Sequence, residues 1–168
     1  MIGRKPLNAG RMRWYGLRVG DVVTDYLRRP IAVPSLPLGV ETDARAFRSL
    51  VVRLDFMDNN HVYVLGEDGR ERSAVAELLV VEHKIEDQNS RMGPPYPSLV
   101  QRRVLFLLHR GWRLQFDLGK GLFLNDARGN KIQVRPNAYS AMRAYNLLDY
   151  SVNIGATLKA RGRLMEGR

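Results

Sequence analysis

The sequence has no cysteine, and this absence removes several kinds of chemistry. Without thiols the chain can form no disulfide, no thiolate nucleophile, no iron–sulfur cluster and no cysteine-type zinc site. Histidine is scarce, and the three that occur, His61, His83 and His109, are scattered along the chain. None has a second histidine or a carboxylate at metal-ligand spacing. We therefore expect solvent-facing or capping roles for all three, with no metal and no cofactor.

Long hydrophobic runs and catalytic motifs are missing as well. No apolar run approaches the roughly 18 residues that cross a bilayer, and VLFLLH at 104–109 fits a short helix. The stretch MIGRKPLNAGRMRW lacks the apolar segment of a secretory signal. No Walker, G-x-G-x-x-G, G-x-S-x-G or H-E-x-x-H motif occurs. We expect a cytoplasmic protein that is not an enzyme, has no small-molecule substrate and binds no membrane.

Positive charge is abundant and unevenly placed. Residues 1–30 carry seven basic and two acidic side chains, and residues 31–90 carry six basic and eleven acidic ones. Residues 91–168 carry fourteen basic and four acidic side chains, so the net charges of the three segments are +5, −5 and +10. This separation favours contact with a polyanion, either DNA or RNA, or with an acidic protein surface at the two ends.

The first half of the chain has the pattern of a small antiparallel sheet. Residues 1–13 form a basic arm that cannot bury a face, so we expect it to be extended or disordered unless bound. Alternating strands follow in GDVVTDY, SLVVRLDFMD and HVYVLG, separated by turns rich in Asp, Asn and Gly. The stretch RRPIAVPSLPLGVETDARAF, residues 28–47, predicts a long loop because prolines interrupt it.

The order GDVV, VVRLDF, HVYVLGEDGRERSAVAELLVV resembles a small SH3-like barrel of the KOW or Tudor kind, over residues 14–87. Such barrels contact RNA, DNA or proteins, so the resemblance does not choose among these partners. The aromatic residues available here do not make the methyl-lysine cage of Tudor modules: Tyr15, Tyr26, Phe56 and Tyr63. Because residues 31–90 are acidic, their charge disfavours contact with nucleic acid and favours a protein contact for this half.

The composition of residues 88–98, QNSRMGPPYPS, predicts a linker between two domains. A helix should follow, with Ser98 as its N-cap and Gly111 as its stop. Three short strands are expected in WRLQF, LFLND and KIQV, and a second helix from Asn137 through residue 148. Alternation places Trp112, Leu114 and Phe116 on the inner face of this meander, and Lys131 and Arg135 on its outer face.

Residues 99–149 carry the pattern L-x-x-G-W-x-L, G-x-x-L-x-D-x-x-G-x-x-x-x-V-x-P. This pattern resembles winged-helix-like modules of uncharacterised phage and plasmid proteins. Only one helix is expected before the strands, whereas a helix-turn-helix needs two, so we expect phosphate contacts from strands and turns. The basic tail, residues 150–168, is expected to be flexible until it meets a partner.

Together these patterns predict an α+β protein: an SH3-like β-barrel, then a helix–β-meander–helix module, with flexible basic ends. The first hypothesis is a nucleic-acid-binding accessory protein that contacts the phosphate backbone of DNA or RNA. The alternative is a protein–protein adaptor, inhibitor or virion component of a phage or mobile element, with an acidic or ribonucleoprotein partner. The candidate nucleic-acid-binding residues are Arg4, Lys5, Arg11, Arg13, Arg102, Arg103, Lys120, Arg128, Lys131, Arg135, Lys159, Arg161 and Arg163.

Overall fold

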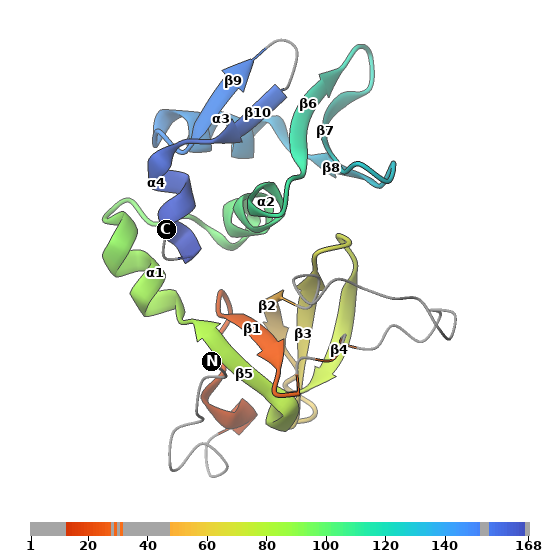
Figure 1. The fold of residues 1–168 in the computed structure, drawn as a ribbon, viewed down its shortest axis with the longest axis vertical. Helices are drawn as coiled ribbons and strands as arrows, with labels where there is room; N and C mark the ends of the chain where they lie inside the picture. The colour runs from red at the N-terminus through yellow and green to blue at the C-terminus, as the bar shows by residue number, and fades with distance from the viewer. Residues whose placement is uncertain (1–12, 28, 30, 32–47, 152–154, 167–168) are drawn as a thin grey trace. The chain divides into compact units, whose positions relative to one another are not determined.

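The computed structural model describes residues 13–27, 29, 31, 48–151 and 155–166. The protein is a mixed α+β structure that divides into two compact units, Met1–Ile85 and Glu86–Arg168. Each unit contains a five-stranded antiparallel sheet, and Figure 1 labels the helices and strands of both.

The first unit is built on strands β1 (Val22–Asp25), β2 (Ser49–Leu54), β3 (His61–Gly66), β4 (Glu71–Val75) and β5 (Leu79–His83), which lie in the order β4-β3-β2-β1-β5. A single 3₁₀ turn, η4 (Ala76–Leu78), separates β4 from β5, and another, η2 (Arg13–Gly16), precedes β1. The sheet is open in the described part of the chain, since β4 and β5 are its two edges. The closed barrel expected from the sequence is therefore not formed there. The loop expected over residues 28–47 lies almost wholly outside the described residues.

The core of the first unit comes from alternating valines on neighbouring strands. Val23, Val51, Val62 and Val64 are fully buried, and Trp14 packs against the same cluster. β-branched side chains suit a pleated surface, because their restricted rotamers lose little freedom there. All four residues of β1 are buried, as expected for a strand that pairs on both edges.

The sequence Gly20–Asp21 fixes the start of β1. The φ angle of Gly20 is +98°, and a Cβ atom there would lie 2.6 Å from Cδ1 of Ile85. The buried Asp21 carboxylate accepts hydrogen bonds from the backbone amides of Arg18 and Ile85, at 3.0 and 2.9 Å. Position 20 requires glycine, because its backbone is in the left-handed region. The Asp21 carboxylate provides acceptors for two backbone amides that lie outside the strands.

The second unit contains most of α1 (Ile85–Met92), then α2 (Leu99–His109), β6 (Arg113–Asp117), β7 (Gly121–Asn125), β8 (Lys131–Val134), α3 (Pro136–Ala144), β9 (Leu148–Ser151), β10 (Gly155–Leu158), α4 (Ala160–Arg163) and the 3₁₀ turn η5 (Leu164–Glu166). Its strands lie in the order β8-β7-β6-β10-β9. The meander β6–β7–β8 is thus extended by a hairpin from the end of the chain, because β10 pairs with β6.

Helices α2 and α3 lie against one face of this sheet (Figure 1). Ser98 caps α2 in a capping box with Gln101, as the sequence predicts, and Gly111 follows the helix with φ +92°. Alternation is confirmed on the covered face of the sheet, where the buried side chains are Trp112, Leu114, Leu122, Leu124 and Val134. Phe116 is an exception: it follows the same alternation, but its side chain is 56% exposed at the end of β6.

Several expectations about the second unit were wrong. The expected linker over residues 88–98 begins inside α1, so two helices precede the strands instead of one. Helix α3 starts at Pro136 with Arg135 as its N-cap, and it ends at Ala144 rather than near residue 148. The tail expected to be flexible contains the end of β9, all of β10 and α4, and both Ala156 and Met165 are fully buried. Glycine, proline and basic residues favour a loop when considered locally, but long-range packing has overridden that tendency.

Candidate functional site

The face of the second sheet opposite α2 and α3 carries three rows of side chains across β6, β7 and β8. Strand register places Arg113, Asn125 and Lys131 in one row, and Gln115, Phe123 and Gln133 in the next. Asp117 and Arg135 belong to the third row by alternation. We call these eight residues the outer sheet face. All are exposed or half-buried, in contrast to the leucines on the covered face.

Phe123 lies at the centre of the outer sheet face, and Lys131 extends across it. The Lys131 Nζ atom is 4.7 Å from the centroid of the Phe123 ring and 2.7 Å from Oδ2 of Asp117. The hydrogen bond and the charge of Lys131 lower the pKa of Asp117 below its ordinary value. Both partners of this ion pair are more than one third exposed, so screening by solvent keeps its net contribution to stability small. Lys131 can therefore leave Asp117 at small cost.

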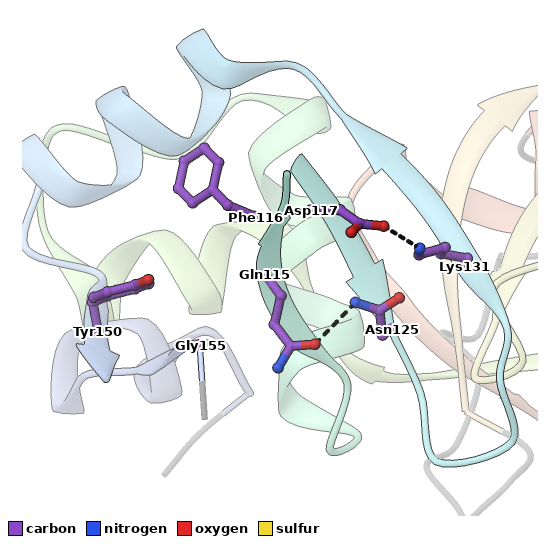
Figure 2. A pocket seen from close by; sticks show the side chains of 7 residues that line it. All are labelled: Gln115, Phe116, Asp117, Asn125, Lys131, Tyr150 and Gly155. Carbon is purple, nitrogen blue, oxygen red and sulfur yellow. Dashed lines mark hydrogen bonds and ion pairs between the residues drawn. The ribbon is translucent and has the colours of Figure 1, made fainter. Parts of the chain in front are cut away.

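Two amide side chains lie beside the aromatic ring. The Nδ2 group of Asn125 donates a hydrogen bond to Oε1 of Gln115 at 3.1 Å. Both residues line a shallow, open depression of about 360 Å³, whose other lining residues are Phe116, Asp117, Lys131, Tyr150 and Gly155. Figure 2 shows the amide pair and the Asp117–Lys131 pair over neighbouring strands. The depression thus combines hydrogen-bonding groups with an exchangeable cation.

Gly155 makes the neighbouring strand pairing possible. Its φ angle is +84°, and a Cβ atom there would lie 2.5 Å from the carbonyl oxygen of Leu114 and 2.6 Å from Cγ of Gln115. Any larger residue would collide with β6 and displace the Gln115 side chain. The glycine therefore holds β10 close to β6 and leaves the floor of the depression free of a side chain.

Further cations lie in the turns at the two ends of the outer sheet face. Lys120 lies in the turn between β6 and β7, and Arg128 lies in the turn between β7 and β8; both are exposed. Desolvation acts to raise the pKa of the Asp126 carboxylate, but hydrogen bonds from the Asn130 side chain and from the backbone amides of Asn130 and Arg128 lower it overall. Within the described chain, no hydrogen bond or ion pair is made by these four side chains: Arg113, Lys120, Arg128 and Arg135.

Arg102 was a candidate nucleic-acid-binding residue, but the structure buries it. Its side chain is buried, with only 3% of the residue exposed, and desolvation lowers the pKa of its guanidinium. The guanidinium donates to the Pro97 carbonyl oxygen, to Oε1 of Gln88 and to Oδ1 of Asn89. Arg102 thus joins α2 to α1 and is not available to a phosphate.

Three candidate cations near the end of the chain also make internal contacts. Arg161 donates to the backbone carbonyl groups of Met92, Gly93, Pro95 and Tyr145. Lys159 donates to Oδ1 of Asn146 and lies 3.8 Å from an Asp149 carboxylate oxygen, and Arg163 donates to the Leu158 carbonyl. The structure therefore does not bring these side chains to the outer sheet face.

The remaining candidates are spread over the chain. Arg4, Lys5 and Arg11 lie outside the described residues. Arg13 belongs to the first unit, where it donates to Oδ1 of Asn59 and stacks on Trp14. Arg103 is half-buried on α2. Of the expected set, Lys120, Arg128, Lys131 and Arg135 are therefore the residues that the second sheet gathers.

The first unit has an exposed apolar turn between β2 and β3. Phe56 and Met57 are 72% and 96% exposed. The Asp55 carboxylate accepts hydrogen bonds from the amides of Met57 and Asp58, and the Trp14 indole donates to the Asp55 carbonyl oxygen at 3.0 Å. Trp14 has φ +49° and lies edge-on to the Phe56 ring at 5.3 Å. The turn is thus fixed at its base and apolar at its tip.

Two of the three histidines lie next to carboxylates. His61 Nδ1 is 2.5 Å from Oδ2 of Asp58, and His109 Nδ1 is 3.7 Å from Oε2 of the buried Glu166. Arg110 also pairs with Glu166, so these ion pairs join η5 to the C-terminal end of α2. In the part of the chain that the structure describes, no group of three His, Cys, Asp or Glu side chains is arranged to hold a metal ion. None of the described helices has the length and apolar character needed to cross a membrane.

Comparison of the chain with protein-family models, with curated proteins and with solved structures finds no match. The site residues predicted from the sequence did not include Arg113, Gln115, Phe123 and Asn125. Their signal was present in the alternation of WRLQF and LFLND, which sets these residues opposite the buried leucines. Identifying the row also required the register between the strands, which depends on contacts distant in sequence.

Proposed function

We propose that the protein is a non-enzymatic nucleic-acid-binding protein that contacts the phosphate backbone through the outer sheet face. The observation that carries this proposal is the grouping of Arg113, Lys131 and Arg135 on one open face, with Lys120 and Arg128 in the turns at its ends. Successive rows are separated by two residues of strand, so the three rows span about 13 Å. Cations spaced along a surface of this length suit a chain of phosphates.

The charge of the second unit supports the same proposal. Residues 86–168 contain fourteen basic and six acidic side chains, which gives a net charge of +8. Each of the two acids near the outer sheet face has a cation close by: Asp117 pairs with Lys131, and Asp126 holds the turn that carries Arg128. The net charge of the unit is therefore positive around these acids, which favours a polyanion.

The helices of the second unit offer weaker surfaces for nucleic acid. Most of α2 is buried, including the run from Val104 to Leu108. Helix α1 begins with Glu86 and Asp87, whose charges would repel phosphates. A recognition helix needs an exposed face that enters a groove, so these features support contact through the sheet.

We infer further that the first unit has an SH3-like arrangement. The support is the order of its elements: a long connection between β1 and β2, a meander β2–β3–β4, and one 3₁₀ turn before β5. An SH3-like arrangement is a more specific fold than α+β, but the fold alone does not identify a ligand.

The proposed function is tested with a charge-reversal pair. Arg113→Glu with Arg135→Glu removes two cations of the outer sheet face. We expect binding to labelled DNA and RNA, measured by fluorescence anisotropy at several salt concentrations, to weaken about ten- to a hundred-fold. The slope of log affinity against log salt should fall by about 1.4 to 1.8, because each lost phosphate contact removes about 0.7 to 0.9.

The matched control is Arg70→Glu with Lys84→Glu in the first unit, which makes the same change in net charge at two exposed positions. If both pairs weaken binding equally, only total charge matters and the outer sheet face is not the site. If the wild-type protein binds neither DNA nor RNA at low salt, the proposed function is wrong.

A second candidate function, binding of a protein partner, is favoured by the apolar turn of the first unit. Exposed apolar side chains on a firmly held turn are typical of interface hot spots. A photoreactive amino acid placed at position 57 should cross-link one defined protein in the cells that make this chain. The same group at position 118, where the leucine is fully exposed in the second unit, is the control. Equal cross-linking from both positions would count against this candidate.

A further inference from the structure

Phe123 has a position that phosphate binding alone does not explain. It is the only aromatic side chain among the eight residues of the outer sheet face, and it occupies the middle strand of the meander. Its cross-strand neighbours are the polar residues Gln115 and Gln133. On the same strand, Gly121 has no side chain to shield the ring on that side. A large apolar ring on an otherwise polar, half-exposed face calls for a ligand that has an apolar surface of its own.

The Lys131 ammonium group that covers the Phe123 ring can change its ion-pair partner. Lys131 lies above Phe123 and pairs with Asp117, and both charged groups remain in contact with solvent. A phosphate that replaced Asp117 as the partner of Lys131 would draw the ammonium group away from the ring. The face of Phe123 would then be open for stacking.

The amide groups next to the ring complete the environment. An amide side chain offers both a hydrogen-bond donor and an acceptor, which is the combination that the edge of a nucleobase presents. Asn125 and Gln115 are hydrogen-bonded to each other over neighbouring strands (Figure 2), and the strand register places both next to Phe123. A planar base above the ring would therefore meet hydrogen-bonding groups at its edge and cations near its phosphates.

From this arrangement we propose that the outer sheet face binds single-stranded nucleic acid, with one unpaired base stacked on Phe123 after Lys131 has transferred from Asp117 to a phosphate. The bases of a duplex are stacked on each other, so their flat faces are not accessible to a ring on a sheet. Single strands are therefore preferred over duplex of the same sequence. This inference rests on the proposed function, because it names the class of nucleic acid that the same face takes.

The decisive variant is Phe123→Leu, which keeps an apolar side chain on the strand and removes the ring. Single-strand affinity, measured by fluorescence anisotropy on a mixed-sequence oligonucleotide, should fall about 5- to 150-fold. Duplex affinity and the salt slope should be unchanged. Phe123→Trp should bind single strands at least as tightly as the wild-type protein does, since the larger tryptophan ring also stacks on a base.

Tyr96→Leu is the matched control, because the Tyr96 ring is also exposed, at 53%, but precedes α2 and lies outside both the outer sheet face and the depression. It should leave both affinities unchanged. Asp117→Asn frees Lys131 from its ion pair, so it should raise single-strand affinity about two- to five-fold. Far-UV circular dichroism of each variant establishes that the fold is retained.

The outcomes separate this inference from the proposed function. If the wild-type protein binds nucleic acid with a steep salt dependence but Phe123→Leu binds single strands as the wild type does, the stacking inference is wrong and the phosphate-binding proposal stands. The stacking inference is also wrong if Phe123→Leu weakens single-strand and duplex binding in equal proportion. If the wild-type protein binds neither form, both proposals are wrong.

Discussion

Replacing Arg102 with methionine should destabilise the second unit by about 3 kcal/mol. Methionine keeps an unbranched apolar stem of similar length, so it fills most of the space and removes only the guanidinium. That group is buried, and its three hydrogen bonds go to Gln88, Asn89 and the Pro97 carbonyl. The consequence of the substitution therefore depends on the acceptors that lose their donor.

The magnitude follows from the burial of those acceptors. The Gln88 side chain is fully buried and Pro97 is buried, so each loses a partner that water cannot easily replace, at about 1–3 kcal/mol apiece. Asn89 is half-buried, and water can satisfy it at lower cost. Together the losses at Gln88 and Pro97 amount to about 2–6 kcal/mol. Burying a guanidinium that has no carboxylate partner is unfavourable in the native protein, and removing it offsets part of this loss. The difference leaves a net loss of about 2–4 kcal/mol.

Urea denaturation followed by far-UV circular dichroism measures this loss, and hydrogen exchange of the amides of α2 assigns it to the second unit. Arg143→Ala, at an exposed position of α3, is the control and should change the free energy of unfolding by less than about 0.5 kcal/mol. Replacing Arg102 and Gln88 together by methionine should recover roughly 1–2 kcal/mol of the loss, because the buried Gln88 oxygen that has lost its Arg102 donor is then removed as well. A single Arg102→Met variant as stable as the wild type would refute the structural role assigned to this arginine.

Three further outcomes are expected. Gly155→Ala should destabilise the protein by about 2–4 kcal/mol in urea denaturation, because its Cβ atom would overlap the Leu114 carbonyl at a positive φ angle; no change would mean that β10 can shift freely. Trp14→Ala should cost about 3–5 kcal/mol from lost packing, and unfolding curves that match the wild type would contradict that expectation. Lys131→Met should raise the pKa of Asp117 toward its ordinary value of about 3.9, as followed by carboxyl NMR shifts. Since the native pKa is depressed, the ion pair favours the fold above that ordinary value, and the benefit is lost as pH falls through the native pKa.

Local patterns predicted much of the second unit. Alternation in WRLQF correctly placed Trp112 and Leu114 inside, and the capping residue Ser98 and the stop at Gly111 were both found. These signals are local: a strand has a period of two, and a helix start needs an acceptor for its free amides. The sequence therefore contained enough information for the elements of the meander.

The pairing of the chain's last segment could not be predicted in the same way. The segment of residues 155–158 is short and begins with glycine, and it was predicted to belong to a flexible tail. They form a strand because Gly155 allows β10 to approach Leu114 of β6, about forty residues earlier in the chain. Arg102 was misplaced for a related reason, since its partners Gln88 and Asn89 belonged to a segment interpreted as a linker. Neither contact leaves a periodic pattern in the sequence.

The structure also changes what the net charge of the protein means for binding. A basic composition predicts affinity for polyanions only if the cations are accessible, yet Arg102 is buried and Arg161 is bound to four backbone carbonyl groups. Both contribute to the net charge and hold the fold together. Arg113, which the sequence analysis did not select, has no such internal partner in the described chain and lies beside Lys131. Affinity for a phosphate chain should therefore depend on a few cations in register on one sheet, and Arg113→Glu should weaken binding more than Arg163→Glu, although both change the net charge equally.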